Sequence, residues 1–117
     1  MISLLKSKIH RATVSDSNLN YNGSITIYKE LMKQAGIYEY EKVSVVNINN
    51  GNRFDTYVIK GDNPDSRICI NGAAARLVEI GDLIIIMSYR LVDESKADWY
   101  KPRIVKVNEY NEIINEK

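Results

Sequence analysis

Residues 43–59 read VSVVNINNGNRFDTYVI. Two runs rich in β-branched and aromatic residues, 43–48 and 53–59, flank an Asn-Asn-Gly-Asn segment at 49–52. Such runs favour strands, and Asn-Gly between them is a strong signal for a tight turn joining antiparallel strands. The sequence therefore predicts a β-hairpin near the middle of the chain.

Further short strands are expected on both sides of this hairpin, because their residues alternate or form β-branched apolar runs. We place them at residues 8–14, 25–27, 68–70, 83–89 and 104–107. The run at 83–89 is apolar without a period, which indicates a strand buried on both faces. Many short strands predict a mainly β fold, a small closed or nearly closed barrel, since closure removes exposed strand edges.

Two short helices complete the expected elements. The first covers residues 30–35 and stops at Gly36, and the second covers residues 73–78. Residues 16–20 are expected to form a turn. The polar residues 108–117 are expected to fray.

Composition indicates an ordinary globular chain. The 117 residues suggest one domain, with 44% apolar and 26% charged residues. Sixteen basic and fifteen acidic side chains give a net charge of +1, so no basic stripe points to nucleic acid. No apolar run is long enough to cross a membrane, and the N-terminus lacks the pattern of a signal peptide. The lone cysteine, Cys69, suits a reducing cytoplasm and a buried apolar position, and no spacing of ligand residues predicts a metal.

The turn Tyr21-Asn22-Gly23-Ser24 carries the most distinctive chemistry. A serine hydroxyl at a tight bend can attack the carbonyl of the residue before it, and glycine tolerates the backbone angles that this needs. The negative charge of the tetrahedral intermediate requires a nearby donor, such as the hydroxyl of Thr56. Elimination would then release Gly23 as a new C-terminus and leave a pyruvoyl group derived from Ser24. That ketone forms a Schiff base with an amine and withdraws electrons as pyridoxal phosphate does.

Several motifs stand in one order along the first 90 or so residues. They are Lys8-Ile9-His10-Arg11, Tyr21-Asn22-Gly23-Ser24, Asn50-Gly51-Asn52-Arg53-Phe54-Asp55-Thr56-Tyr57, Asn71-Gly72-Ala73-Ala74-Ala75 and Val78-Glu79-Ile80-Gly81-Asp82. In this order and spacing the chain resembles the pyruvoyl-dependent aspartate 1-decarboxylases, which make β-alanine for pantothenate biosynthesis. It departs from them at Val46, at Asn22 and in the tail after Tyr100.

The resemblance implies a double-psi β-barrel with short helices. It also implies a cytoplasmic homotetramer, with active sites between neighbouring subunits and no nucleic acid or membrane partner. Residues 1–117 would cleave themselves between Gly23 and Ser24 into a β fragment, 1–23, and an α fragment, 24–117. The α fragment would begin with the pyruvoyl group and decarboxylate L-aspartate.

The resemblance also assigns roles to single residues. Ser24 and Tyr57 would be catalytic, with the phenol of Tyr57 returning a proton after CO2 leaves. Gly23, Ser24 and Thr56 would act in processing. The substrate would be bound by Lys8, Arg53, Thr56 and the Asn71-Gly72-Ala73-Ala74 segment, with Arg53 gripping a carboxylate in a forked geometry. His10, the only histidine, would stand near the substrate or be merely structural.

Two other functions remain open from the sequence. In one, the chain is a non-catalytic β-barrel binding module and Gly23-Ser24 is only a turn. In the other, the same mechanism acts on a different amino acid. A chain that stays at full length favours the binding module, whereas self-cleavage favours an enzyme. Comparing CO2 release from aspartate and from glutamate distinguishes an aspartate decarboxylase from an enzyme for another amino acid.

Overall fold

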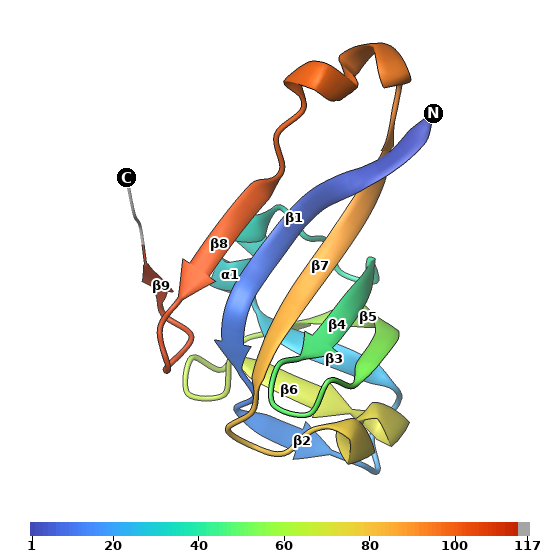
Figure 1. Ribbon diagram of the computed structural model, residues 1–117. Helices are drawn as coiled ribbons and strands as arrows, with labels where there is room; N and C mark the ends of the chain where they lie inside the picture. The colour runs from blue at the N-terminus through green and yellow to red at the C-terminus, as the bar shows by residue number, and fades with distance from the viewer. Residues whose placement is uncertain (115–117) are drawn as a thin grey trace.

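The computed structural model describes residues 1–114, and Figure 1 shows their arrangement. Strands dominate, which confirms the mainly β class. The strands are β1 Ile2–Thr13, β2 Asp16–Asn18, β3 Ser24–Tyr28, β4 Lys42–Asn47, β5 Arg53–Gly61, β6 Ile68–Asn71, β7 Leu83–Val92, β8 Arg103–Val107 and β9 Ile113–Ile114. The α-helix is α1 Lys29–Ala35, and the 3-10 helices are η1 Gly72–Leu77 and η2 Glu94–Trp99. None of the helices in residues 1–114 has the length and apolar character that crossing a membrane requires.

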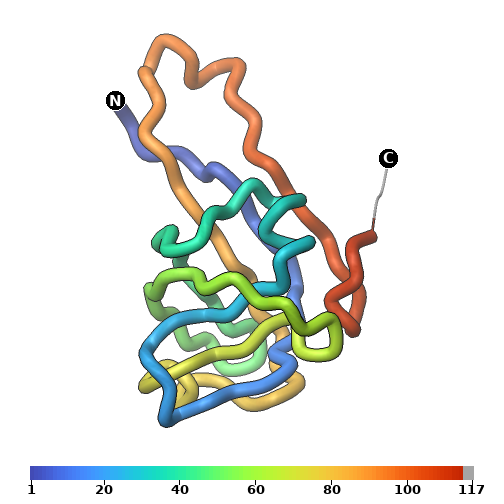
Figure 2. The backbone as a smooth tube through the Cα atoms, turned by 180° about the vertical axis from the view of Figure 1, so that it is seen from behind, coloured from blue at the N-terminus to red at the C-terminus, as the bar shows by residue number. Residues whose placement is uncertain are grey.

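The strands hydrogen-bond in the order β2-β6-β3-β5-β4-β7-β1-β8-β9. Three neighbouring pairs are parallel (β1 with β8, β2 with β6, β3 with β5), and the other five are antiparallel, three of them consecutive from β5 through β4 and β7 to β1. The tube in Figure 2 shows the lower strands wrapped closely together, while β1 and β7 extend beyond them as an arm. Both the N-terminus and η2 lie at the tip of that arm (Figure 1).

The central hairpin is confirmed. β4 and β5 pair antiparallel from Lys42 opposite Tyr57 to Val46 opposite Arg53. Its turn also anchors η1, because the carbonyl oxygen of Leu77 accepts hydrogen bonds from the side-chain amides of Asn47, Asn50 and Asn52 at 3.1–3.2 Å. The asparagine-rich turn therefore holds the end of the helix that follows β6.

The core consists of the inward-facing branched side chains of these strands. The largest that are fully buried include Ile9, Ile25, Ile27, Leu31, Ile68, Ile70, Ile84 and Ile86. Helix α1 covers one side through Leu31, Met32 and Ala35 and ends at the left-handed Gly36, as expected. Burial of this apolar surface is the main source of stability for a chain without a disulfide.

The structure corrects three expectations about strands. β1 begins at Ile2 instead of residue 8, because its first residues pair with the far end of β7, Ile2 opposite Val92. Part of the expected turn at 16–20 is the strand β2, which finds its backbone partners on β6. β7 is buried on one face only: Ile84 and Ile86 lie in the core, while its other face is half-buried.

The second expected helix also differs. It is a 3-10 helix that begins at Gly72, instead of two α-helical turns. Gly72 is left-handed, with φ +75°, and Val78 beyond the helix is extended, so only a short helix fits between them. Short helical segments commonly adopt the 3-10 form.

The expected fraying of the C-terminal segment is wrong for residues 108–114, while residues 115–117 lie outside the described part of the chain. β9 pairs with β8, and Asn111 is 1% exposed. The Asn111 side chain substitutes for a neighbouring strand: Oδ1 accepts from Thr13 N and Nδ2 donates to Thr13 O, both at 2.7 Å. Nδ2 also donates to Ser15 Oγ at 3.1 Å.

Asn111→Ala should therefore destabilise the fold. It leaves the backbone N–H and C=O of Thr13 without these partners, and a buried polar group that loses its partner costs about 1–3 kcal/mol. Alanine also tolerates the left-handed backbone of Asn111, φ +61°, less well than asparagine does. We expect a loss of about 2–4 kcal/mol in urea unfolding, against little change for Asn20→Ala on the exposed loop. Equal midpoints for the two variants would contradict this.

Candidate active site

Ser24 is the first residue of β3 and is fully buried. β3 lies between β5 and β6, and Ser24 is paired with Asn71 at the end of β6. Asn71 Nδ2 donates to Ser24 Oγ at 3.0 Å, and Oγ donates to the carbonyl oxygen of Asn22 at 3.0 Å. The hydroxyl that the sequence singles out is therefore held from two sides, next to the peptide bond that it would attack.

The Asn71 side chain has two further partners, which sequence reasoning missed. Nδ2 also donates to Thr26 Oγ1 at 3.0 Å, and Cys69 Sγ donates to Oδ1 at 3.2 Å. Residues two apart on a strand share a face, so Ser24 and Thr26 on β3 lie beside Cys69 and Asn71 on β6. Only the pairing of the two strands reveals this group.

Gly72 packs directly against the proposed cleavage point. A Cβ atom at Gly72 would lie 2.6 Å from Gly23 Cα, 2.8 Å from Gly23 N and 3.2 Å from Tyr21 O. No real side chain fits there. The Asn71-Gly72 segment therefore supports the turn before Ser24 from behind.

Tyr57 lies on the same side of the sheet as Ser24. β3 and β5 run parallel with Ile25 opposite Val58, and Ser24 and Tyr57 each stand one residue earlier. Tyr57 is 36% exposed, and its ring lies 6.3 Å from that of Tyr40. Since side chains alternate along a strand, Thr56 faces the other side. The chain does not bring Thr56 to the face that carries Ser24, and its role in processing stays a prediction.

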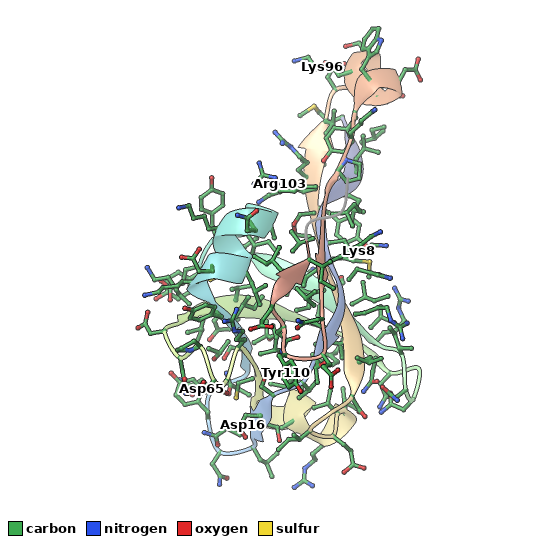
Figure 3. The ribbon with its side chains drawn as sticks, turned by 90° about the vertical axis from the view of Figure 1, so that its left-hand side faces the viewer. Lys8, Asp16, Asp65, Lys96, Arg103 and Tyr110 are labelled. Carbon is green, nitrogen blue, oxygen red and sulfur yellow. The ribbon has the colours of Figure 1, made fainter. Side chains whose placement is uncertain are left out.

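Lys8 and Arg53 lie away from Ser24. Lys8 on β1 is separated from β5 by β7 and β4, which amounts to three strand spacings, about 14 Å. Figure 3 shows Lys8 midway along the long arm strand, far from Asp16 on β2. Arg53 is four residues before Tyr57, about 13 Å along β5. Both residues face outward, because the neighbours of Lys8 and the alternate residues of β5 point to the core.

Half-buried apolar side chains separate these two cations. Val46 on β4 is paired with Arg53 and with Ile85, and Met87 is paired with Lys8. We call Lys8, Val46, Arg53, Ile85 and Met87 the outer band. Apart from Thr56, which faces the other side of the sheet, the predicted site residues thus fall into two groups, one around Ser24 and one along this band.

His10 lies beside Lys8 on the same face of β1. Its Nδ1 is buried without a hydrogen-bond partner in the described chain. Burial lowers the pKa of His10 below its usual 6.5, and the positive charges of Lys8, Arg11 and Lys106 lower that pKa further. A neutral imidazole among cations suits a position that receives an anion, although the role of His10 remains a prediction.

This lowered pKa predicts how stability depends on pH. The unfolded chain takes up a proton on His10 near pH 6.5, while the folded chain stays neutral to lower pH. The contribution of neutral His10 to the free energy of unfolding is fully present above about pH 6.5, and it is lost as the pH falls toward the pKa of His10 in the folded chain. Urea unfolding between about pH 7.5 and about pH 5.5 should show less loss of stability for His10→Asn than for the wild-type chain. An equal loss of stability in the variant and the wild-type chain would contradict this role of His10.

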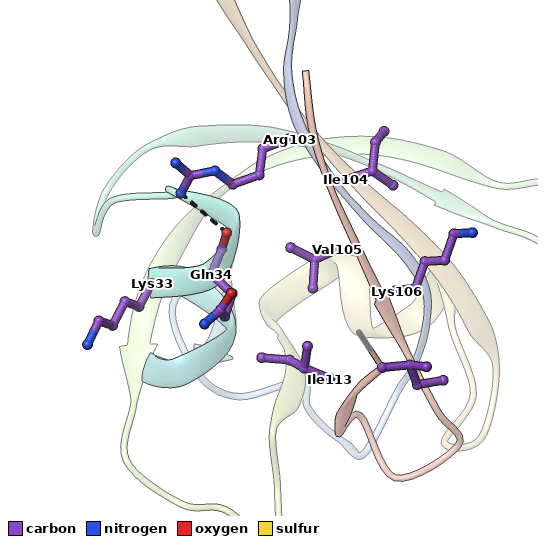
Figure 4. A pocket seen from close by; sticks show the side chains of 8 residues that line it. Lys33, Gln34, Arg103, Ile104, Val105, Lys106 and Ile113 are labelled. Carbon is purple, nitrogen blue, oxygen red and sulfur yellow. Dashed lines mark hydrogen bonds between the residues drawn. The ribbon is translucent and has the colours of Figure 1, made fainter. Parts of the chain in front are cut away.

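The remaining predicted residues lie on η1. Ala73 is exposed, and Ala74 is partly buried against the core. Residues 1–114 contain no group of three or more His, Cys, Asp or Glu side chains that could hold a metal ion. None of the predicted site residues lines the cavity of about 560 Å³ between α1, β8 and β9 (Figure 4). Arg103 crosses it to donate to the carbonyl oxygen of Gln34 at 3.3 Å.

The fold is that of the double-psi β-barrels. The chain is similar to the crystal structure of a computationally designed double-psi β-barrel protein, with a TM-score of 0.50 over 74% of this chain and 99% of that one. The two are only 19% identical, so the likeness concerns the fold alone. The expected barrel architecture is confirmed.

A sequence profile of the aspartate decarboxylase family matches residues 1–114, and the chain belongs to this family of carboxy-lyases. It is 65% identical to an aspartate 1-decarboxylase of Caldicellulosiruptor bescii over 97% of this chain and 88% of that protein. It is 60% identical to an aspartate 1-decarboxylase of Acetivibrio thermocellus over 99% of this chain and 92% of that protein. The match continues past Tyr100 to residue 114, so it includes most of the tail that the sequence analysis sets apart.

Proposed function

We propose that the chain cleaves itself between Gly23 and Ser24, converts Ser24 into a pyruvoyl group at the start of the 24–117 fragment, and decarboxylates L-aspartate to β-alanine and CO2. Membership of the aspartate decarboxylase family supports the overall reaction. The observation that supports self-cleavage is a fully buried Ser24 hydroxyl held at 3.0 Å by Asn71, directly after a glycine backed by Gly72. A surface turn would need none of these contacts.

The proposed cleavage involves only atoms of this chain and water. Ser24 Oγ bonds to the Gly23 carbonyl carbon through a five-membered ring, the C–N bond breaks, and the hydroxyl proton passes to the Ser24 nitrogen. The Ser24 Cα–H proton then leaves, the Cβ–Oγ bond breaks, and Gly23 departs as a carboxylate. Water replaces the nitrogen, which leaves as ammonia. The pyruvoyl carbonyl, once formed, supplies an electron sink for a substrate amine.

Side chains of the protein would bind the substrate and move one proton. Lys8 and Arg53 would hold the side-chain carboxylate of aspartate, since holding the carboxylate that leaves would raise the barrier to its loss. The Tyr57 hydroxyl, on the face that carries Ser24, would give a proton to the carbon that loses CO2. Asn71, Gly72, Ala73 and Ala74 would border the substrate at the end of β6.

A homotetramer would explain the separation of the two groups. Lys8 and Arg53 lie too far from Ser24 to complete its site in the same chain, and the outer band exposes half-buried Val46, Ile85 and Met87 between them. If a neighbouring subunit covers this band, Lys8 and Arg53 of one chain would lie at the Ser24 site of the neighbouring chain. Co-expressing an Arg53→Ala chain with a Ser24→Ala chain should then restore activity that neither has alone. Two inactive variants that stay inactive together would contradict shared sites.

The substrate assignment is tested by CO2 release. The cleaved enzyme should release CO2 from L-aspartate and give β-alanine in equal amount. L-glutamate, one methylene longer, is the matched comparison. Preference for glutamate would favour the same mechanism on another amino acid, and no release from either would favour the binding module.

A further inference from the structure

We infer that Cys69 and Thr26 are positioning residues that fix the Asn71 side-chain amide so that its N–H points at Ser24 Oγ. This inference rests on the proposed self-cleavage and adds two residues to it. Their contacts are the 3.2 Å bond from Cys69 Sγ to Asn71 Oδ1 and the 3.0 Å bond from Asn71 Nδ2 to Thr26 Oγ1.

The two contacts act at opposite ends of one amide. An amide can rotate by half a turn and exchange its oxygen and nitrogen with little change in shape. Cys69 offers a donor to the oxygen end, and Ser24 Oγ needs a donor because its own proton goes to Asn22 O. With the amide reversed, Asn71 would present an oxygen to Ser24, and Cys69 would face an N–H with only a weak sulfur acceptor. Cys69 therefore selects the productive orientation.

The thiol is suited to this task because it stays protonated. Burial raises the pKa of Cys69, and the negative charge of Asp16 raises it further. Asp16 is paired with Cys69 across the β2–β6 strands. Cys69 thus serves as a donor over the physiological pH range. The sequence suggests a buried apolar position for Cys69, whereas the residue is half-buried and its thiol makes a polar contact with Asn71.

The orientation of Asn71 matters most in the elimination step. When the Cβ–Oγ bond breaks, Ser24 Oγ becomes a carboxylate oxygen of Gly23 and gains negative charge. A donor already placed at that oxygen stabilises the transition state without reorganisation. Loss of its orientation should therefore slow elimination more than ester formation, and the ester should accumulate.

The test compares Cys69→Ala, which removes the donor, with Cys69→Ser, which keeps one. Precursor cleavage is followed by intact mass, with and without hydroxylamine, which splits esters into a 1–23 hydroxamate and a 24–117 chain with an intact serine. Losing one hydrogen bond should slow formation of the pyruvoyl chain about tenfold in Cys69→Ala. The hydroxylamine products should increase in that variant, and Cys69→Ser should restore the wild-type pattern. A purely structural role would not raise the trapped ester.

A second pair guards against a folding defect. Thr26→Val keeps the shape of the side chain but removes the acceptor, so it should slow cleavage and accumulate ester as Cys69→Ala does. Thr26→Ser keeps the acceptor and should cleave like the wild-type chain, as Cys69→Ser does. If the wild-type chain cleaves, and Cys69→Ala and Thr26→Val both cleave as fast as the wild-type chain, the positioning role is overturned while self-cleavage stands. If the wild-type chain never cleaves, the proposed function fails and this inference fails with it.

Discussion

Ser24→Ala should leave the purified chain at full length and without decarboxylase activity. The substitution removes the only oxygen that can close a five-membered ring on the Gly23 carbonyl, so neither the ester nor the pyruvoyl group can form. Without the pyruvoyl group the chain has no covalent electron sink for the substrate, so we expect a complete loss of turnover. The fold should persist, because alanine fits where serine is buried.

The matched control is Ser66→Ala, at a half-buried position in the loop before β6. It should cleave and turn over like the wild-type chain. Cleavage at residue 23 in Ser24→Ala would show that another group attacks the peptide bond. Full turnover by uncleaved Ser24→Ala would remove Ser24 from the mechanism altogether.

Gly72→Ala should have the second largest effect, although Gly72 carries no reactive group. The new Cβ would meet Gly23 Cα at 2.6 Å, and alanine disfavours the φ of +75°. Displacing a reacting group by about 1 Å costs about 100-fold in rate, so cleavage should slow by at least that factor. Overpacking and the left-handed backbone together should cost about 2–5 kcal/mol of stability.

Gly51→Ala separates the two contributions. Gly51 has nearly the same backbone angle, φ +78°, but no atom lies within 4 Å of the position of a new Cβ. It should lose about 1–2 kcal/mol and cleave at the wild-type rate. Equal cleavage rates in the two variants would show that contact with Gly23 does not matter.

The sequence alone places the proposed reacting groups of this site in local motifs. Gly23, Ser24 and Asn71 stand in short motifs, and the hairpin at 43–59 follows from its Asn-Gly turn. What the sequence could not show is how the motifs meet. The Asn71–Ser24 bond joins residues 47 apart and depends on the pairing of β3 with β6. Thr26 and Cys69 carry no motif and enter the site only through that pairing.

Long-range pairing also explains the corrections to the fold. The tail looks polar and free in sequence, yet Asn111 is bonded to Thr13, 98 residues away. The apolar run of β7 suggests burial on both faces, but only one faces the core. Its other face belongs to the outer band, so its composition reflects a contact outside the single chain if the proposed tetramer forms.

Intact mass of the purified chain under denaturing conditions tests the central claim most directly. We expect two fragments, residues 1–23 ending in a free carboxylate and residues 24–117 beginning with a pyruvoyl group. The larger fragment should resist N-terminal sequencing, because a ketone replaces its amine. A chain that turns over aspartate while it retains one unbroken mass and an unaltered Ser24 would contradict the mechanism.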